Sequence, residues 1–401
     1  MSDLIESEKR VLFQNYGRQP IVLVRGKGTR VWDDEDRSYL DFVGGLAVNV
    51  LGHAHPVVAA AIAAQAQTLI HTSNLYYTEP MVELAQILVD NSTLDRVLFV
   101  NSGAEAIEGA IKLARRWGHD ERSGAHGIIS FNDGFHGRTF GALAATGTPR
   151  YREPFEPMPP GFAHVPWNDL GAVKAATDER TVAVLAEPIQ GEGGVNMPDD
   201  GFLQGLQAWC RERNLLLILD EIQTGNGRTG TLFAYEQYGL DPDIVCLAKG
   251  LAGGVPIGAV LAKEAIAKHL VPGDHGTTFG AGPLATAAGV ATMRQILDEQ
   301  LPAKAARASD RLVSRLRAIE DRSPMVTGVR GMGLLLAVSL AEDCSAEIVT
   351  ACRERGLLAN NVRPNAVRLM PPLNVSDDEI DEACAILEDA VQAIVAARAA
   401  P

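Results

Sequence analysis

The sequence predicts an α/β fold with two parts: a large domain built on a mostly parallel sheet, and a smaller α+β domain. Short, almost uninterrupted apolar runs recur through the middle of the 401-residue chain, and segments with helical periodicity lie between several of them. Apolar strands that alternate with helices are typical of a parallel sheet covered on both faces. A chain of this length is also long enough to form more than one domain.

Six apolar runs are the strands that we expect in the large domain, residues 50–285. They are RVLFV (96–100), GIISF (127–131), TVAVLAEP (181–188), LLLILDE (215–221), DIVCLAK (243–249) and GAVLA (258–262). Two intervening segments, residues 104–118 and 201–214, carry apolar residues at helical spacing, so we expect a helix in each.

Both ends of the chain, residues 1–49 and 286–401, are expected to form the smaller α+β domain. The N-terminal part predicts a small sheet, because Gly-rich and Asp-rich turns separate its alternating segments. The C-terminal part predicts a long helix over about 293–321, which Pro302 can interrupt, and a strand at GMGLLLAVSL (331–340). A final helix over 377–399 is expected, with Ser376 as its N-cap.

Composition excludes several classes of protein. Lys and Arg number 36 against 50 Asp and Glu, a net charge of −14, which argues against nucleic acid as the main partner. No apolar stretch is long enough to predict a membrane span, and the polar start predicts no secretory signal. The five cysteines show no C-x-x-C spacing, so we expect neither disulfides nor a zinc site, and a cytoplasmic location.

Residues suited to one kind of chemistry follow the expected strands. In an open α/β sheet, ligands bind at the carboxyl ends of the strands. Residues 101–104, Asn-Ser-Gly-Ala, open a helix whose N–H groups suit a phosphate, Asp220 closes a buried strand, and Lys249 closes the next. Taken singly, each feature has a purely structural explanation. The segment 101–104 can be an ordinary helix start, Asp220 can be an N-cap, and Lys249 can extend its amine to solvent along an apolar surface.

Together these residues meet the needs of pyridoxal 5'-phosphate. A desolvated lysine supplies a free amine for covalent attachment of the cofactor, and a buried acid keeps the cofactor's ring nitrogen protonated. The ring of Phe135 can lie over the face of the pyridine. No carboxylate or cysteine lies at ligand spacing from His53, His55 or His136, so no metal site is expected.

Motifs along nearly the whole chain resemble the class III, fold-type I aminotransferases, most closely those acting on N-acetylornithine. They are GGLAVNVLGHAHP (44–56), HTSNLYYTEP (71–80), NSGAEAIEGAIKLAR (101–115), FHGRTFGALAATG (135–147), EPIQGEGGV (187–195), DEIQTGNGRTG (220–230), LAKGLAGGVPIGA (247–259) and GTTFGAGPLA (276–285). Two positions depart from the usual pattern: Asn226, and Ala281-Gly282 where the family has Gly-Asn.

The resemblance implies a role for each matching residue that contacts the cofactor. Lys249 would attach the cofactor covalently, Asp220 would pair with its ring nitrogen, Gln223 would bind its ring hydroxyl, and Phe135 would stack on it. The remaining expected cofactor residues are Ser102, Gly103 and Ala104 at the phosphate, His136 beside the ring, and Thr278. Thr278 matches a threonine that reaches the phosphate of the neighbouring subunit, which implies a homodimer with shared sites.

Substrate residues are also implied by the resemblance. Arg138 and Arg368 match arginines that bind carboxylates, for which a guanidinium fork is suited. Glu192 matches an acid that pairs with the second arginine when the substrate has no second carboxylate. Thr277 stands where the family has a serine that contacts substrate, and Tyr16 would line the entrance.

The resemblance implies an enzyme that transfers the δ-amino group of N-acetylornithine to 2-oxoglutarate in arginine biosynthesis. The alternative is a related ω-aminotransferase acting on ornithine, succinylornithine, a lysine-pathway analogue, 4-aminobutyrate or a diamine. An aminomutase would keep Lys249 and Asp220 but need no oxo acid. A non-catalytic relative would have lost Lys249 or Asp220, and both are present.

Overall fold

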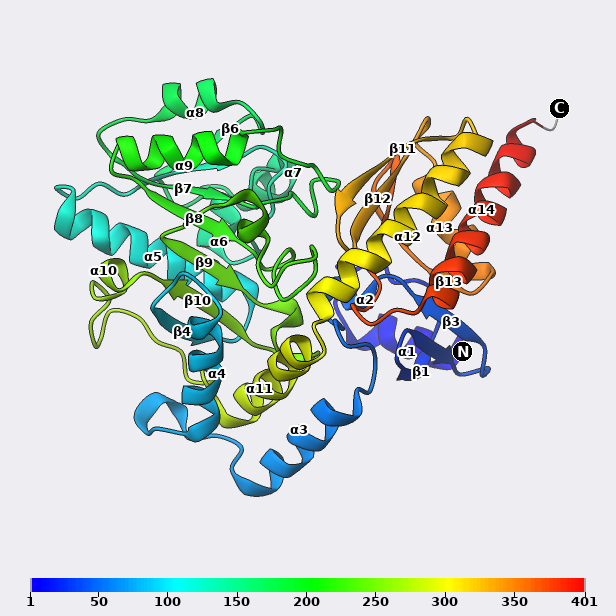
Figure 1. The fold of residues 1–401 in the computed structure, drawn as a ribbon, viewed down its shortest axis with the longest axis horizontal. Coiled ribbons are helices and arrows are strands. Elements are labelled where there is room, and N and C mark those ends of the chain that lie inside the picture. Colours follow the sequence, from blue (N-terminus) through cyan, green and yellow to red (C-terminus); the bar gives the residue numbers. More distant parts are fainter. Residues whose placement is uncertain (1, 400–401) are drawn as a thin grey trace.

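A seven-stranded sheet forms the centre of the larger lobe in the computed structural model, which describes residues 2–399 (Figure 1). Its order is β4 (Arg96–Val100), β10 (Gly258–Ala262), β9 (Ile244–Leu247), β8 (Leu216–Asp220), β7 (Thr181–Ala186), β5 (Gly127–Phe131) and β6 (Phe162–Val165). Only β10 runs antiparallel to its neighbours in this sheet, so the prediction of a mostly parallel sheet is confirmed. The edge strand β6, which is short and only partly buried, was not predicted.

Helices cover both faces of this sheet, as the apolar strands require. In β8, Leu216 and Ile218 belong to the core beneath α5 (Gly103–Glu121), whereas Leu217 and Leu219 belong to the core that includes α9 (Phe202–Glu212). Successive side chains of a strand point to opposite faces, so a strand that is apolar throughout is buried on both sides. Every residue of β7, β8, β9 and β10 is buried.

The long helix predicted over 293–321 is two helices. Helix α11 (Pro283–Asp298) ends before Gln300, whose backbone is left-handed (φ +52°), and α12 (Leu301–Arg322) starts with Pro302 in its first turn. A proline is tolerated at this position because the N–H groups of the first turn have no intrahelical acceptor. Helix α12 leads from the larger to the smaller lobe (Figure 1).

Two four-stranded sheets form the smaller lobe. One has the order β11 (Val326–Met332), β12 (Leu335–Leu340), β15 (Ala366–Leu369) and β14 (Asn360–Arg363). The other has β1 (Leu23–Lys27), β2 (Arg30–Asp33), β3 (Ser38–Asp41) and β13 (Leu357–Leu358). Strand β13 is parallel to β3, which brings both ends of the chain into one sheet. We propose on this basis the division into 50–285 and 1–49 with 286–401.

The single strand predicted over 331–340 is wrong, because this segment contains a hairpin turn between β11 and β12. Gly333 takes a left-handed backbone (φ +57°) at the turn. The final helix is confirmed as α14 (Asp377–Ala399), and the backbone N–H of Glu379 donates to Ser376 Oγ at 3.3 Å. The preceding helix of this lobe is α13 (Ser345–Glu354).

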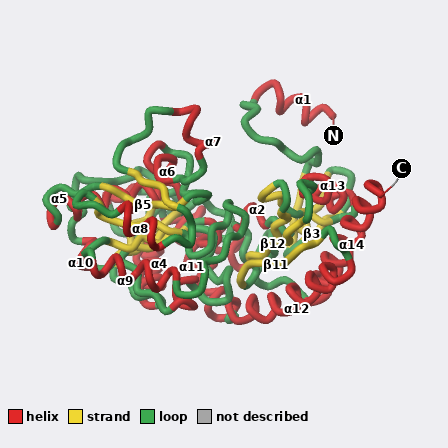
Figure 2. The backbone as a smooth tube through the Cα atoms, turned by 90° about the horizontal axis from the view of Figure 1, so that it is seen from above, coloured by secondary structure: helices red, strands yellow, loops and turns green. Residues whose placement is uncertain are grey.

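The remaining helices are short or lie at the periphery. They are α1 (Ser2–Val11), α2 (Gly44–Ala47), α3 (Pro56–Thr68), α4 (Glu79–Asp90), α6 (Phe140–Ala145), α7 (Pro149–Arg152), α8 (Leu170–Ala176) and α10 (Glu264–Ala267). Figure 2 shows α1 standing apart from the sheets. Within residues 2–399, no helix has both the length and the apolarity needed to cross a bilayer.

Candidate active site

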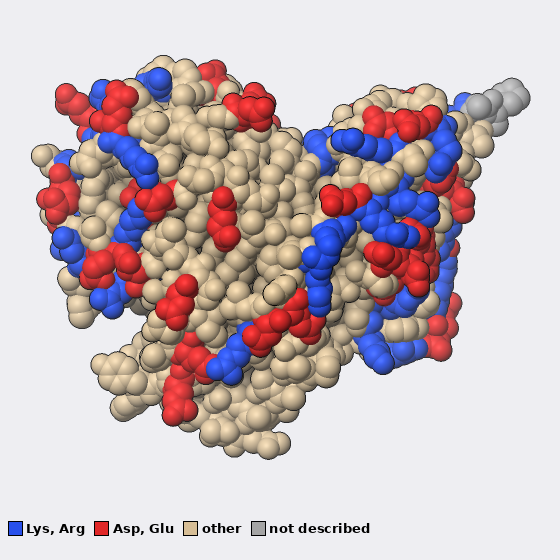
Figure 3. Space-filling view, viewed as in Figure 1, with Lys and Arg blue, Asp and Glu red and all other residues tan. Residues whose placement is uncertain are grey.

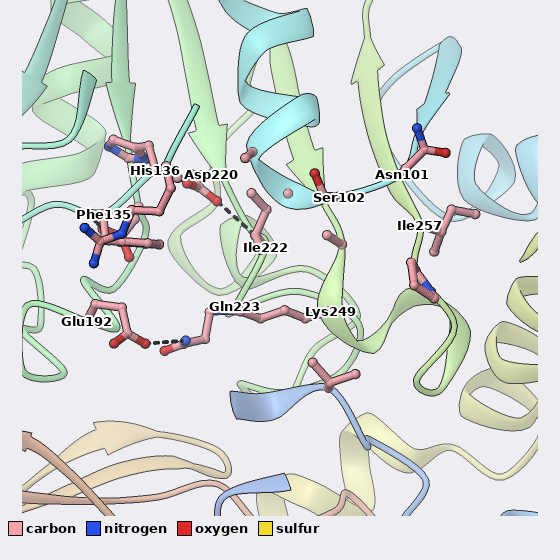
Figure 4. A pocket seen from close by; sticks show the side chains of 18 of the residues that line it. Asn101, Ser102, Phe135, His136, Glu192, Asp220, Ile222, Gln223, Lys249 and Ile257 are labelled. Atoms are coloured by element: carbon pink, nitrogen blue, oxygen red, sulfur yellow. Dashed lines mark hydrogen bonds and ion pairs between the residues drawn. The ribbon is translucent and has the colours of Figure 1, made fainter. Parts of the chain in front are cut away.

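The carboxyl ends of the parallel strands meet at one edge of the large sheet, and a cavity of about 480 Å³ lies there. Ten predicted site residues line it: Ser102, Gly103, Ala104, Phe135, His136, Arg138, Glu192, Asp220, Gln223 and Lys249. In Figure 4, Phe135 and His136 lie on one side, Ser102 lies on the other, and Asp220 and Lys249 lie between them. The sheet topology therefore brings together residues that are far apart in the sequence.

An anion cradle is formed where β4 gives way to α5. Ser102 is the N-cap, and its Oγ accepts the backbone N–H of Glu105 at 3.2 Å. Gly103 and Ala104 occupy the first turn, where N–H groups have no intrahelical acceptor and attract phosphate. A Cβ on Gly103 would lie 2.9 Å from the Ile222 side chain, so a larger residue here would displace that side chain.

Asp220 is buried at the end of β8 and is paired with a histidine. Its Oδ2 lies 2.7 Å from His136 Nδ1, and its Oδ1 accepts the backbone N–H of Ile222 at 3.1 Å. Burial alone would lower the pKa of His136, but the hydrogen bond and charge of Asp220 outweigh it, so the pKa of His136 is raised. The pair therefore retains a proton beside the cavity, with the carboxylate held in a fixed orientation.

Lys249 follows β9 with an unusual backbone. Its φ is +40°, a value that side-chain-bearing residues rarely adopt, and the site holds this conformation. Asn226, one of the two departures from the family pattern, donates from Nδ2 to the carbonyl of Ala248 at 3.1 Å. Burial lowers the pKa of Lys249, although the Glu192 charge opposes this, so the amine is more readily neutral than an exposed lysine.

Arg368, on β15 of the smaller lobe, contacts two residues that line the cavity. Its guanidinium is buried and lies 2.7 Å from Glu192 Oε1 and 3.1 Å from Gln223 Oε1. Its Nη2 donates to Asn360 Oδ1 at 2.8 Å. Burial alone would raise the pKa of Glu192, but the charges of Arg368 and Lys249 outweigh it and lower the pKa to about 2. The Glu192 carboxylate is therefore ionised at neutral pH.

Arg138 lines the cavity and lies over aromatic rings. Its guanidinium carbon lies 3.8 Å from the centre of the Tyr151 ring and 5.4 Å from that of Phe135. The Phe135 and Tyr151 rings meet edge to face, with centres 6.1 Å apart. Tyr151 was not predicted, because nothing in its sequence neighbourhood distinguishes it.

Four predicted residues lie outside the lining of this cavity: Arg368, which contacts two of its lining residues, and Thr277, Thr278 and Tyr16. Thr277 lies behind it, where its Oγ1 accepts Asn101 Nδ2 at 2.8 Å. Thr278 follows Thr277 in the chain, and Tyr16 is exposed in the segment after α1, with the Arg18 guanidinium 5.3 Å from its ring centre. The structure thus brings neither Thr278 nor Tyr16 to the cavity of their own chain.

Glu187 is a buried acid of the site that sequence reasoning missed. It directly follows β7, the same position relative to a strand that singled out Asp220 after β8. Its carboxylate accepts the backbone N–H groups of Phe135 and Gly191, both at 3.0 Å. Burial raises its pKa. Glu187 thereby fixes the segment that carries Phe135.

These residues fit pyridoxal phosphate. The first turn of α5 offers N–H groups to a phosphate, and the cavity places the buried acid Asp220 and the desolvated amine of Lys249 on its walls. Phe135 supplies an aromatic face. Within residues 2–399, no group of three or more His, Cys, Asp or Glu side chains is placed to hold a metal ion.

Comparisons with known proteins agree with this chemistry. An acetylornithine aminotransferase of Methanothermobacter thermautotrophicus is 49% identical over 385 residues, 96% of this chain and 97% of that protein. One of Gloeobacter violaceus is 51% identical over 94% of each chain. A solved ornithine aminotransferase of Toxoplasma gondii, with pyridoxal phosphate partially occupying its active site, superimposes with a TM-score of 0.95 at 36% identity, covering 99% of this chain and 96% of that one.

A model of one family covers almost the whole sequence. The model described as Aminotransferase class-III matches residues 12–391, which include every predicted site residue. Enzymes of this family use pyridoxal phosphate to exchange an amino group between a donor and an oxo acid. The chain belongs to the class III aminotransferases, pyridoxal-phosphate-dependent transaminases.

Proposed function

We propose that this enzyme transfers the δ-amino group of N-acetylornithine to 2-oxoglutarate, giving N-acetylglutamate 5-semialdehyde and glutamate, a reaction of arginine biosynthesis. The observation that carries the proposal is the ion pair between the buried Arg368 and the partly exposed Glu192 close to Lys249, because it suits two substrates with different numbers of carboxylates. The proposal is further supported by relatives at 49% and 51% identity that are acetylornithine aminotransferases.

Different residues of this chain would bind the cofactor and move the substrate proton. When bound, pyridoxal phosphate supplies an electron sink for the charge left when the substrate carbon loses its proton. The first turn of α5 would hold the phosphate, Phe135 would cover the ring, and the Asp220 carboxylate would keep a proton on the ring nitrogen. Lys249, whose pKa is lowered by burial, would take the proton from the substrate carbon and return it.

Two arginines would bind the carboxylates of both substrates. N-acetylornithine has one carboxylate, which Arg138 would bind while Glu192 keeps the charge of Arg368 paired. 2-Oxoglutarate and glutamate have two, so their second carboxylate would replace that of Glu192 on Arg368. A guanidinium suits this role because its fork of N–H groups can bind a carboxylate through two hydrogen bonds.

Replacing Glu192 by Gln should therefore favour the dicarboxylic substrates. Arg368 loses its ionic partner but keeps its hydrogen bonds to Gln223 and Asn360. We expect the KM for glutamate to fall by about threefold to tenfold, the equivalent of roughly 1 kcal/mol, and that for N-acetylornithine not to fall. Steady-state kinetics with each substrate measures this, and equal changes for both would contradict the proposed exchange.

A spectral half-reaction tests the function. The yellow holoenzyme is mixed, without any oxo acid, with N-acetylornithine, ornithine, 4-aminobutyrate or putrescine. We expect rapid bleaching with N-acetylornithine that 2-oxoglutarate reverses. Bleaching with only a free diamine or 4-aminobutyrate would contradict N-acetylornithine as the substrate, but it would still agree with a transaminase.

Ornithine is the second candidate donor, because the superimposed Toxoplasma gondii protein is an ornithine aminotransferase. The two donors differ at the α-nitrogen, which is a neutral amide in one and a cation in the other. An aminomutase would show turnover without 2-oxoglutarate, so the same experiment separates it.

We propose that the enzyme acts as a homodimer with shared active sites. Residues 42–78 contain no Asp, Glu, Lys or Arg, yet Leu75, Tyr76 and Tyr77 are exposed. Figure 3 shows few charged side chains around α3, at the bottom of this face. Phe279, next to Thr278, is also exposed, and its ring centre lies 5.0 Å from that of His71 in the same region. Exposed apolar surface of this kind typically binds another protein chain.

Thr278→Ala should weaken cofactor retention, because the proposed dimer places this hydroxyl at the partner's phosphate. We expect the dissociation constant for pyridoxal phosphate to rise about tenfold to a hundredfold, the effect of losing one hydrogen bond to a charged group. Equilibrium dialysis measures it, with Thr231→Ala as the control, since Thr231 Oγ1 donates to the Phe233 carbonyl away from the cavity. An unchanged constant would contradict the shared site.

We also propose a cytoplasmic location. All five cysteines are buried and unpaired, an arrangement that a reducing compartment preserves.

A further inference from the structure

Arg228 is a buried cation with no acid beside it. It is 1% exposed, and burial is the cause that lowers its pKa to about 9. Its Nη1 donates to two backbone carbonyls, of Leu334 at 3.0 Å and of Pro371, whereas its Nε and Nη2 have no partner among the described residues. Burying an unpaired cation costs several kcal/mol, and an apolar side chain of similar size would avoid that cost. Its position therefore calls for a reason other than stability.

The two carbonyls that Arg228 contacts lie at the same end of the β12–β15 strand pair, just beyond Arg368 on β15. Leu334 is in the turn that leads into β12, and β12 pairs with β15 so that Ala337 lies opposite Arg368. Pro371 follows the end of β15, three residues after Arg368. The backbone also joins this contact, since the N–H of Leu334 donates to the carbonyl of Arg228 at 2.9 Å.

Arg228 itself belongs to the loop that begins with Asp220. This loop leaves β8, passes through Gln223, and turns at Gly225 to Gly227 before reaching Arg228. Gln223 touches Arg368 at 3.1 Å, and Arg228 touches the chain just beyond Arg368. The loop and β15 are therefore held together at two points, one of which is the substrate-binding arginine and the other the Arg228 side chain.

We propose that Arg228 is a positioning residue. It holds β15 of the smaller lobe against the loop that begins with Asp220, and this contact aligns Arg368 to receive the second carboxylate of a substrate. A guanidinium can donate to both carbonyls in fixed directions, which a methionine cannot do and a lysine does with poorer geometry. The inference rests on the proposed role of Arg368. It identifies Arg228, which touches no substrate, as a further residue on which dicarboxylate binding depends.

The test compares substrates that use Arg368 with one that does not. In Arg228→Met, we expect the KM for glutamate and 2-oxoglutarate to rise about 10- to 100-fold, since a displacement of about 1 Å has effects of that size. The KM for N-acetylornithine should change less than threefold, because Glu192 already occupies Arg368 in that complex. The maximal rate of each half-reaction should change less than threefold, which separates positioning from general damage to the site.

Arg228→Lys and Arg311→Met complete the design. Arg228→Lys should raise the KM for the dicarboxylates by less than Arg228→Met does, and it carries the test if Arg228→Met does not fold. Arg311 pairs with Asp381 on the exposed side of α12, so Arg311→Met should change none of these constants. Equal KM increases for N-acetylornithine and glutamate, or a loss of rate with unchanged KM, would overturn the proposal.

The outcome is distinguishable from failure of the proposed function. Glutamate is common to every transaminase alternative considered above, so its half-reaction in wild type and variants can be read even if N-acetylornithine proves not to be the donor. In that case the donor identified by the spectral experiment takes the place of N-acetylornithine. The proposal about Arg228 then stands or falls on whether the KM for the dicarboxylates rises more than the KM for that donor.

Discussion

Lys249→Ala is expected to lower the rate of turnover by at least about 10³-fold, because the substitution removes both the point of covalent attachment and the group that moves the substrate proton. The amine is well suited to this role: it lies in the cavity wall, burial lowers its pKa, and its left-handed backbone holds it there. Steady-state assay with N-acetylornithine and 2-oxoglutarate measures the loss.

Lys263→Ala is the matched control. Lys263 follows β10 at the opposite edge of the same sheet, where it pairs with Asp241 at 2.7 Å. This variant should keep activity within about twofold of wild type, since exposed ion pairs contribute little to stability. Full activity of Lys249→Ala would remove this lysine from the mechanism.

Asp220→Asn is expected to lower turnover by about 10²- to 10³-fold, the effect of removing one preorganised charge interaction from a site. The side chain keeps its shape, but the neutral amide can no longer stabilise a proton on the cofactor's ring nitrogen. The variant should also lower the pKa of His136, because burial then acts without the opposing carboxylate charge. Kinetics measures the first effect, and the NMR titration of the histidine measures the second.

The same substitution at the other edge of the sheet controls for damage to the fold. Asp243 precedes β9, and its Oδ2 accepts the backbone N–H of Leu217 at 2.8 Å. Asp243→Asn should therefore reduce stability modestly and leave the pKa of His136 unchanged. If Asp220→Asn kept turnover within tenfold of wild type, the ring nitrogen would not depend on this acid.

Several features of the fold could be predicted from local sequence because they depend on local physics. The six predicted strands are almost uninterrupted apolar runs, and α14 begins after a serine whose hydroxyl caps the helix. Two errors have different causes, one local and one tertiary. The break before α12 depends on the left-handed backbone of Gln300, and the β11–β12 turn depends on Gly333 beside Thr229, a contact with a distant part of the chain.

For the site, the sequence alone determined which chemical groups follow the strands: the N-cap Ser102, the acid Asp220 and the amine Lys249. These follow from the position of a residue after an apolar run, which is a one-dimensional property. The same rule applied to β7 would have found Glu187. Motif resemblance added Arg138, Arg368 and Glu192, and their predicted roles now await the variants described above.

Only the tertiary structure decided how distant residues are paired and what that does to them. The 2.7 Å contact of Asp220 with His136, the burial of Arg368 against Glu192, and the two carbonyls held by Arg228 all join segments separated by many residues. A sequence lists the charges of these groups but not the desolvation and distances that set their pKa values. Those depend on three-dimensional packing, because electrostatic interactions change steeply with burial and separation.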